Sequence, residues 1–272
     1  MLIDTHSHLY FPEFKDDFEA VLDRCNENDV TTLITVGVDV ETSQVALDME
    51  SEKVKFYSTI GIHPHEAYKY TDSEKLKQDI TALEQIYLKN PKKVIALGEC
   101  GLDYLEKDEK IRNLQKQLFQ AQIDLAKKLN LPLIIHCRDD RSENPENIDA
   151  WLDVLKIAGD YKGLLHCYSG TKEITQKALA TNFLISFAGT ITYPKNDYLK
   201  EAVRLVPLEK ITLETDCPFL PPQSIRGQRN EPSRISEIAQ LIAELKEVTV
   251  QEVARQTSKN VARLFAFQGQ KT

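Results

Sequence analysis

The sequence predicts an α/β protein of the TIM (β/α)8 barrel class. Short runs rich in Leu, Ile and Val alternate along the chain with longer segments whose apolar residues recur at helical spacing. Strand and helix repeated in series are typical of a parallel sheet. The sequence offers eight such strands, which is the number that closes a (β/α)8 barrel.

The predicted strands lack a clean alternation of polar and apolar residues, as expected for strands that are buried on both faces. They comprise residues 2–6, 31–37, 54–61, 94–99, 132–137, 163–167, 183–187 and 211–216. Helices are predicted over 13–28, 73–90, 109–130, 145–159 and 171–182, and extra C-terminal helices over 232–267. Leu114, Leu118 and Leu125, for example, lie on one face of the helix predicted over 109–130. An open doubly wound sheet is the alternative, but the chain has no GxGxxG or GxxxxGK[ST] loop.

Length and composition fit one globular domain over residues 1–272. The chain is 42% hydrophobic and 28% charged, and its 34 basic and 42 acidic residues give a net charge of −8. This balance argues against a surface coated in positive charge, but a local basic patch can still receive a phosphate. No segment is apolar enough to span a membrane, and no signal peptide is recognisable at the start. The five cysteines form no CxxC pair, which favours reduced thiols and a cytoplasmic location. We expect a monomer.

Histidines gather where predicted strands end. The chain has six, namely His6, His8, His63, His65, His136 and His166. All of them fall at or just after the carboxyl ends of predicted strands, which form the active rim of a parallel barrel. Residues i and i+2 of a strand point to the same side, so His6 and His8 are a natural pair of metal ligands.

Two carboxylates, Glu99 and Asp216, also end apolar strands, where an acid is costly unless it is paired or bound to a cation. Together with four of the histidines they make six candidate ligands, which is too many for one tetrahedral ion that keeps an open position. The four are His6, His8, His136 and His166. They suit two ions about 3.5–4 Å apart that share one carboxylate. Four cysteines directly follow a candidate ligand in the sequence, namely Cys100, Cys137, Cys167 and Cys217. We expect these thiols to face away from the ligands as buried, small side chains.

These residues resemble the TatD family of metal-dependent deoxyribonucleases. The resemblance is carried by Ile3-Asp4-Thr5-His6-Ser7-His8, Gly61-Ile62-His63-Pro64-His65, Gly98-Glu99-Cys100-Gly101-Leu102-Asp103-Tyr104, Ile135-His136-Cys137-Arg138, His166-Cys167-Tyr168-Ser169-Gly170, Glu214-Thr215-Asp216-Cys217-Pro218 and Arg226-Gly227-Gln228-Arg229-Asn230-Glu231-Pro232. Together they span about residues 3–232 in the family's order.

The resemblance implies a hydrolase that cleaves DNA phosphodiester bonds with two divalent metal ions. It implies that His6, His8 and Asp216 bind one ion, that His136 and His166 bind the second, and that Glu99 bridges them. Imidazole ligands favour Zn, Mn or Fe over Mg, and activity with added Mg or Mn stays plausible. Asp216 is the expected proton acceptor, so Asp216 and Glu99 are the expected catalytic residues.

Four further residues are candidates for substrate contacts. The guanidinium forks of Arg138, Arg226 and Arg229 fit phosphate oxygens, and His63 can donate a hydrogen bond to one. Two other functions stay open from the sequence. One is a metal-dependent amidohydrolase or lactonase that acts on a small molecule, and the other is a non-catalytic protein that holds its metal structurally.

Overall fold

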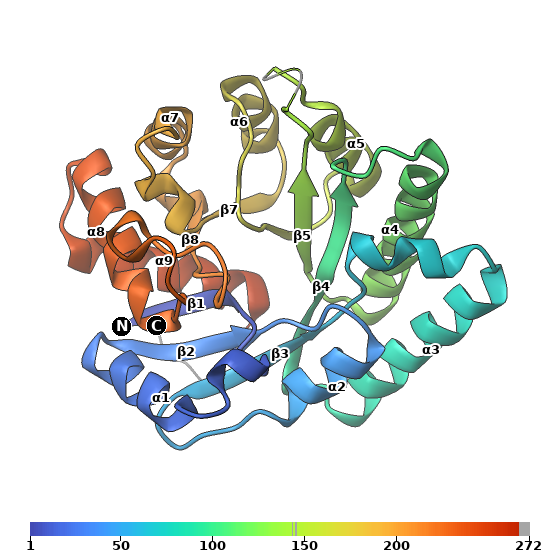
Figure 1. The fold of residues 1–272 in the computed structure, drawn as a ribbon, viewed down its shortest axis with the longest axis horizontal. Helices are drawn as coiled ribbons and strands as arrows, with labels where there is room; N and C mark the ends of the chain where they lie inside the picture. The colour runs from blue at the N-terminus through green and yellow to red at the C-terminus, as the bar shows by residue number, and fades with distance from the viewer. Residues whose placement is uncertain (143, 145, 267–272) are drawn as a thin grey trace. The chain divides into compact units, whose positions relative to one another are not determined.

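The strands of the chain form the parallel sheet that the sequence predicts. A computed structural model describes residues 1–142, 144 and 146–266. Within them, eight strands make one sheet in the order β1 to β8 (Figure 1). They are β1 (Leu2–Ser7), β2 (Val30–Thr35), β3 (Lys55–Ile60), β4 (Val94–Asp103), β5 (Leu133–Arg138), β6 (Gly163–Leu165), β7 (Phe183–Phe187) and β8 (Ile211–Leu213). Ser7 also pairs in parallel with Cys217, just after β8. The predicted (β/α)8 barrel class is confirmed.

Helices alternate with these strands. They are α1 (Phe18–Glu27), α2 (Val40–Asp48), α3 (Ser73–Lys89), α4 (Glu109–Leu129), α5 (Asp149–Ala158), α6 (Lys172–Leu179), α7 (Asp197–Leu205), α8 (Ile235–Lys246) and α9 (Val250–Phe265). Several begin with a side-chain cap, such as Asp108, whose carboxylate accepts from the Lys110 backbone N–H ahead of α4. No helix of the described part of the chain is long and apolar enough to cross a membrane.

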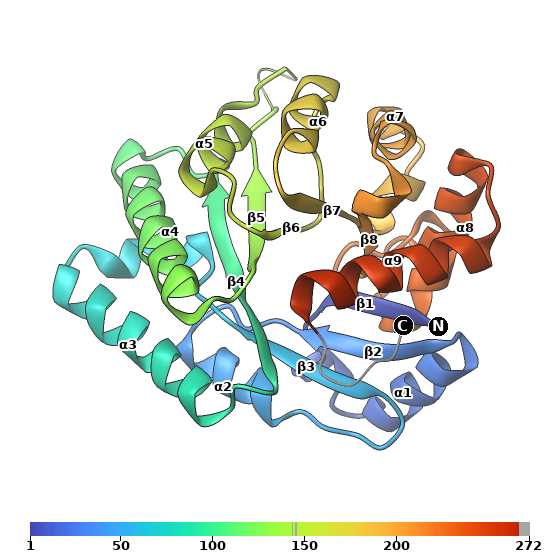
Figure 2. The same ribbon diagram turned by 180° about the vertical axis from the view of Figure 1, so that it is seen from behind.

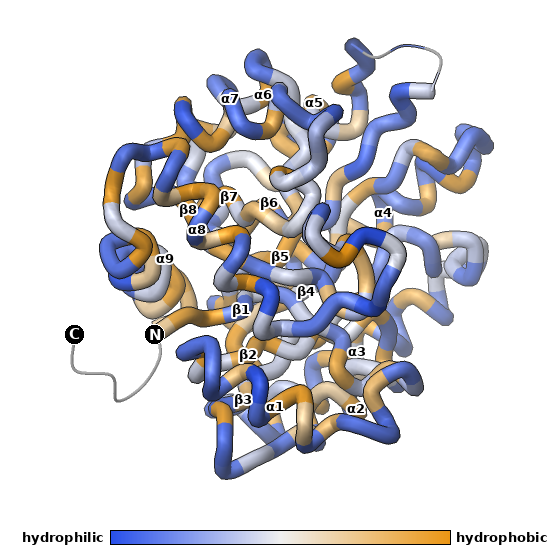
Figure 3. The backbone as a smooth tube through the Cα atoms, turned by 60° about the vertical axis from the view of Figure 1, so that its left-hand side comes forward, coloured by the Kyte–Doolittle hydropathy of each residue, from blue (hydrophilic) through white to orange (hydrophobic). Residues whose placement is uncertain are grey.

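The internal contacts divide the chain into two compact units, so the single domain over 1–272 stays a prediction. The first unit contains Met1–Thr35, Asp48–Tyr57 and the chain from Leu184 onward, and the second contains Val36–Leu47 and Ser58–Phe183. In the second unit, α4 packs along β4 (Figure 2). In the first, α9 carries hydrophobic and hydrophilic stretches side by side (Figure 3). Its buried residues include Val253, Val261 and Phe265.

Several element boundaries differ from the predicted ones. The strands predicted over 163–167 and 211–216 end at Leu165 and Leu213, so His166 and Asp216 lie in the following turns. The helix predicted over 13–28 begins only at Phe18, after a single 3-10 turn at Pro12–Phe14. The helices α2 and α7 are not among the predicted helices. Each has only 9 residues, which is too short for a clear helical period in the sequence. Residues 145 and 267, which bound two predicted helices, lie outside the described residues.

Candidate metal centre

The first group of candidate ligands lies in the first unit, where β1 ends. His6 Nε2 lies 3.1 Å from His8 Nε2, so the two imidazoles point at one another as the sequence predicts. Asp216 Oδ1 lies 3.7 Å from His6 Nε2 and 3.5 Å from His8 Nε2. Two ring nitrogens and a carboxylate oxygen that converge in this way are the donor set of a divalent transition-metal ion. The three residues therefore fit the metal that the sequence predicts.

A buried aspartate, Asp4, supports this group through hydrogen bonds to the backbone beside its members. Asp4 is fully buried, and its Oδ1 accepts from the backbone N–H of His6 at 3.1 Å and of Thr215 at 2.9 Å. Burial raises the pKa of Asp4 to about 8, against the hydrogen bonds from Thr215 and His6 that lower it. Asp4 thereby ties the strand that carries His6 to the turn that carries Asp216. Asp4 is not among the predicted site residues, although an acid after the apolar Leu2-Ile3 at the start of a strand is a signal for such a role.

The turn with Asp216 is held by the RGxxNxP segment. Asn230 is fully buried, and its Nδ2 donates to the carbonyl oxygens of Thr215 at 2.8 Å and Phe219 at 2.7 Å. Asp216 itself has a φ of +57°, a left-handed conformation that a residue other than glycine keeps only where its surroundings impose it. The hydrogen bonds of Asn230 are one such constraint. Asn230 is thus a positioning residue, a role that its place in the RGxxNxP motif does not by itself predict.

The same segment is fixed by ion pairs to α1. Glu231 accepts from Arg24 Nε at 2.8 Å and from Arg24 NH2 at 2.7 Å. Arg229 donates from NH1 and NH2 to the two carboxylate oxygens of Asp17, at 2.7 and 2.6 Å. The pKa of Asp17 is lowered to about 2, chiefly by the hydrogen bonds from Arg229. A contact of Arg229 with phosphate, as predicted, would have to break this pair.

The second group of candidate ligands lies in the second unit. His136 Nδ1 lies 2.8 Å from Glu99 Oε1, and His166 Nε2 lies 3.4 Å from the same oxygen. Glycines on both sides of Glu99 allow this approach. Gly98 and Gly101 have φ angles of +150° and +141°, and an added Cβ would collide with the carbonyl oxygens of Ile134 and His136. A side chain at either position would push β4 away from β5.

Asp103 orients His136. Its Oδ2 lies 3.3 Å from His136 Nε2 and 2.8 Å from His65 Nε2. Burial alone would lower the pKa of His136, but the hydrogen bonds with Asp103 and Glu99 outweigh it and raise the pKa to about 9. A carboxylate that accepts the far N–H of a ligand histidine fixes its tautomer and leaves the other nitrogen for the metal. Here that other nitrogen is Nδ1, which faces Glu99.

His63 belongs beside this group as a hydrogen-bond donor. Its Nε2 lies 3.4 Å from Glu99 Oε1, close enough to make it a third potential ligand. Its Nδ1, however, accepts the backbone N–H of His65 at 3.1 Å. Burial lowers the pKa of His63 to about 4, so the ring is neutral at pH 7 and carries its single proton on Nε2. The assignment of this proton rests on the hydrogen bond to Nδ1.

The other predicted residues lie as follows. Arg138 at the end of β5 is exposed, and so is Arg226, whose guanidinium lies 4.3 Å from the ring centre of Tyr193. Four of the cysteines are buried, Cys167 is partly exposed, and none of these five described residues forms a disulfide. Burial raises the pKa of the Cys100 and Cys137 thiols, which keeps them protonated. Cys100, Cys137 and Cys217 are thus buried as the sequence predicts, whereas the prediction of a buried thiol is wrong for Cys167.

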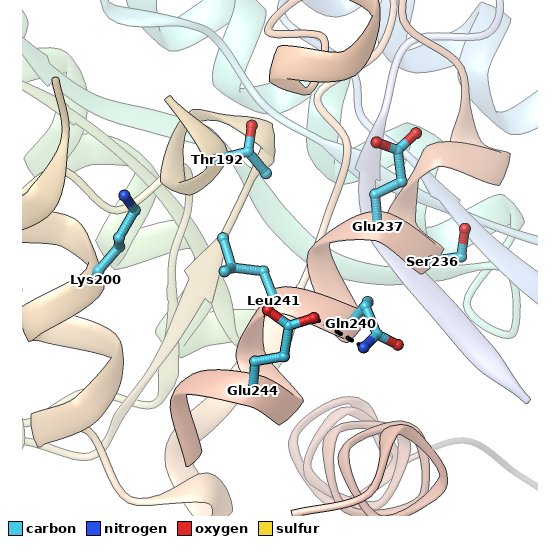
Figure 4. A pocket seen from close by; sticks show the side chains of 7 residues that line it. All are labelled: Thr192, Lys200, Ser236, Glu237, Gln240, Leu241 and Glu244. Carbon is cyan, nitrogen blue, oxygen red and sulfur yellow. Dashed lines mark hydrogen bonds between the residues drawn. The ribbon is translucent and has the colours of Figure 1, made fainter. Parts of the chain in front are cut away.

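A separate hollow of about 490 Å³ lies between α7 and α8 in the first unit (Figure 4). Gln240 and Glu244 form a hydrogen bond of 2.9 Å along its floor. It is lined by Thr192, Lys200, Ser236, Glu237, Gln240, Leu241 and Glu244. None of these residues is a candidate ligand, so the hollow is distinct from both groups described above.

Paired imidazoles beside a carboxylate at the strand ends of a (β/α)8 barrel define the class of metal-dependent barrel hydrolases. A family model described as TatD related DNase matches residues 3–266, and the chain belongs to this TatD family of metal-dependent hydrolases.

Relatives match over nearly their full length. The chain is 38% identical over 270 residues to the uncharacterized metal-dependent hydrolase YabD of Bacillus subtilis, which covers 97% of this chain and 99% of that protein. It is 32% identical over 272 residues to the protein named 3'-5' ssDNA/RNA exonuclease TatD of Pantoea ananatis, covering 98% and 100%. The crystal structure of the TatD homologue YjjV of Escherichia coli matches with a TM-score of 0.84 at 28% identity, covering 97% of this chain and 98% of that one.

Proposed function

We propose that this protein hydrolyses phosphodiester bonds in DNA with the help of two divalent cations. The observation that carries the proposal is the convergence of the His6 and His8 ring nitrogens with the Asp216 carboxylate. The family's description as DNase-related and the exonuclease name of a relative support DNA as the substrate. The first ion is assigned to His6, His8 and Asp216, and the second to Glu99, His136 and His166.

Divalent cations, when bound, lower the pKa of a water molecule toward neutrality and polarise a phosphoryl oxygen. Asp216 would accept the proton of the attacking water, since its partly exposed carboxylate lies 3.5 Å from His8 Nε2 at the proposed ion site. The Nε2–H of His63 donates a hydrogen bond to a phosphoryl oxygen of the substrate. This bond replaces the contact of Nε2 with Glu99 Oε1. Asp103 accepts the Nε2–H of His136, so a bound cation would take the place of the proton that Nδ1 shares with Glu99.

Arginine side chains complete the proposed substrate contacts. Arg138 and Arg226 are exposed and carry the fork that matches two phosphate oxygens. Of the three arginines, Arg229 is the least available for a phosphate contact, because its guanidinium is paired with the Asp17 carboxylate. The sharing of Glu99 by both ions stays a prediction from the family resemblance, and the identity of the metals is open among Zn, Mn, Mg and Fe.

The deciding experiment is the digestion of end-labelled single-stranded and double-stranded DNA with the purified protein. We expect EDTA to abolish hydrolysis and added Mg, Mn or Zn to restore it. Glu99→Gln and Asp216→Asn should each lose at least about 100-fold, the loss typical when a group that stabilises transition-state charge is removed. The loss of metal should be greater in Glu99→Gln, if Asp216 acts mainly on the proton.

Full activity after exhaustive chelation, with no metal found by elemental analysis, would refute the proposal. Hydrolysis of a lactone or amide with no cleavage of DNA under any metal would instead favour a small-molecule hydrolase. Leu205→Ala is the control, because Leu205 at the end of α7 is 41% exposed and is neither a proposed ligand nor a proposed substrate contact.

A further inference from the structure

Aromatic side chains surround the outer face of His8. The aromatic cluster consists of Tyr10, Phe11 and Phe219, all in the first unit. Phe11 stacks on the His8 ring with 5.3 Å between ring centres and an angle of 27°. Phe219 meets Phe11 edge-on at 5.7 Å and lies 6.3 Å from His8. Tyr10 meets Phe11 edge-on at 5.0 Å. Three rings are thus held in contact with one proposed metal ligand.

The cluster is accessible to a ligand. Phe219 is 49% exposed, among the most exposed large apolar side chains of the described chain, and Tyr10 and Phe11 are partly exposed. Tyr10 and Phe11 also line a groove of about 620 Å³ together with Phe14 and Phe18, and the charged residues of that groove are Lys15, Asp48 and Glu50. The turn that presents Phe219 is fixed by Asn230, which binds the Phe219 carbonyl oxygen. An exposed ring on a held turn is a ready binding surface rather than a loosely packed core residue.

Charge alone gives this protein little hold on nucleic acid, because its net charge is −8. Proteins that bind single strands add aromatic rings on which successive bases stack, and this contact tolerates any sequence because every base has a π face. Bases inside a duplex have both faces covered by their neighbours, so only an unpaired base can use such a ring without unstacking.

We propose that the aromatic cluster stacks a base next to the hydrolysed phosphodiester, and that Phe219 is the ring on which this base stacks. The inference rests on the proposed function, since it assigns the base-binding part of the same site. Phe11, which stacks on His8, fixes the position of the base relative to that ring.

The test compares an unmodified single-stranded oligonucleotide with one whose terminal nucleotides at both ends are abasic tetrahydrofuran units. The two substrates share a phosphate backbone and differ only in the bases. The variants are Phe219→Ala, Phe219→Trp and Leu205→Ala. Leu205 is a matched control, because it is also in the first unit and is 41% exposed, at the end of α7. Each variant is assayed for kcat/KM and for bound metal.

We expect Phe219→Ala to lower kcat/KM on the unmodified strand about 10-fold, in the range of alanine substitutions at base-stacking rings. On the abasic strand it should match the wild type, which itself should cleave that strand more slowly than the unmodified one. Phe219→Trp should keep or raise the rate, and Leu205→Ala should change neither substrate. Metal content should be the same in all variants.

Three results would overturn the inference, and they differ from one another. Equal losses on both strands, or a loss of metal, would mean that Phe219 only supports the turn with Asp216. Equal cleavage of both strands by the wild type would remove the base contact and leave the nuclease function intact. No cleavage of either strand with any metal would refute the proposed function, and the base contact with it.

Discussion

Replacement of Asn230 by Ala gives the sharpest test of how the site is held together. The side chain is fully buried and makes three hydrogen bonds, to the carbonyl oxygens of Thr215 and Phe219 and from the backbone N–H of Glu231 at 2.9 Å. A buried hydrogen bond contributes about 1 kcal/mol net, so the loss should be about 3 kcal/mol. With a urea slope of about 3 kcal/mol/M, the unfolding midpoint should fall by about 1 M.

The same change should weaken the metal site. Asp216 keeps its left-handed backbone while the turn is fixed at Thr215 and Phe219, and Asn230→Ala releases both points. Substitution of a residue that positions a metal ligand typically lowers metal affinity or activity about 10–100-fold. We therefore expect Asn230→Ala to lower both the metal affinity and the activity about 10-fold. Asn230→Asp should be no better than Ala, since a carboxylate would face two carbonyl oxygens in place of the amide N–H donors.

Urea unfolding followed by circular dichroism gives the midpoint, and elemental analysis of dialysed protein gives the metal content. The matched control is Asn182→Ala, because Asn182 is exposed and donates one hydrogen bond of 2.8 Å to the Asp160 carbonyl oxygen. Its effect should stay within about 0.5 kcal/mol. If Asn230→Ala has the same urea midpoint as the control and keeps its metal, then other contacts hold the turn and the assigned role of Asn230 is wrong.

Two further predictions concern charge. Burial raises the pKa of Asp139 to about 6, from an unfolded value near 3.8, so the folded state binds the proton more tightly and loses stability as the pH rises from about 4 to 6. Asp139→Asn keeps an acceptor for the Ala150 N–H and should gain about 3 kcal/mol relative to wild type between pH 4 and 7, measured by urea unfolding; parallel pH profiles would contradict this. Arg226→Ala should flatten the salt dependence of single-stranded DNA binding by about 0.7 in the log–log slope, whereas Arg229→Ala should mainly lower stability through the lost Asp17 pair. An unchanged slope in Arg226→Ala would make Arg226 a surface charge only.

Much of this site could be predicted because its signals are local. The i, i+2 spacing of His6 and His8 sets both rings on one side, and the structure brings their Nε2 atoms to 3.1 Å. The apolar run before Glu99 predicts a buried strand, and the structure has β4 there, whereas the close approach of β5 at Gly98 and Gly101 is seen only in the structure. Strand order follows from the alternation of strands and helices, because parallel neighbours need a crossover between them.

Other features depend on contacts between residues that lie far apart in the sequence. Arg229 pairs with Asp17, 212 positions away, so its isolated motif could not show that its fork is engaged. Asp103 lies 33 positions from His136, and only their placement on neighbouring strands shows which imidazole nitrogen is left for a metal. The sequence by itself determined the fold class and indicated the candidate ligands, since these follow from periodicity and residue chemistry. Tertiary structure decided which side chains position the ligands, since a hydrogen bond depends on distances that no local pattern records.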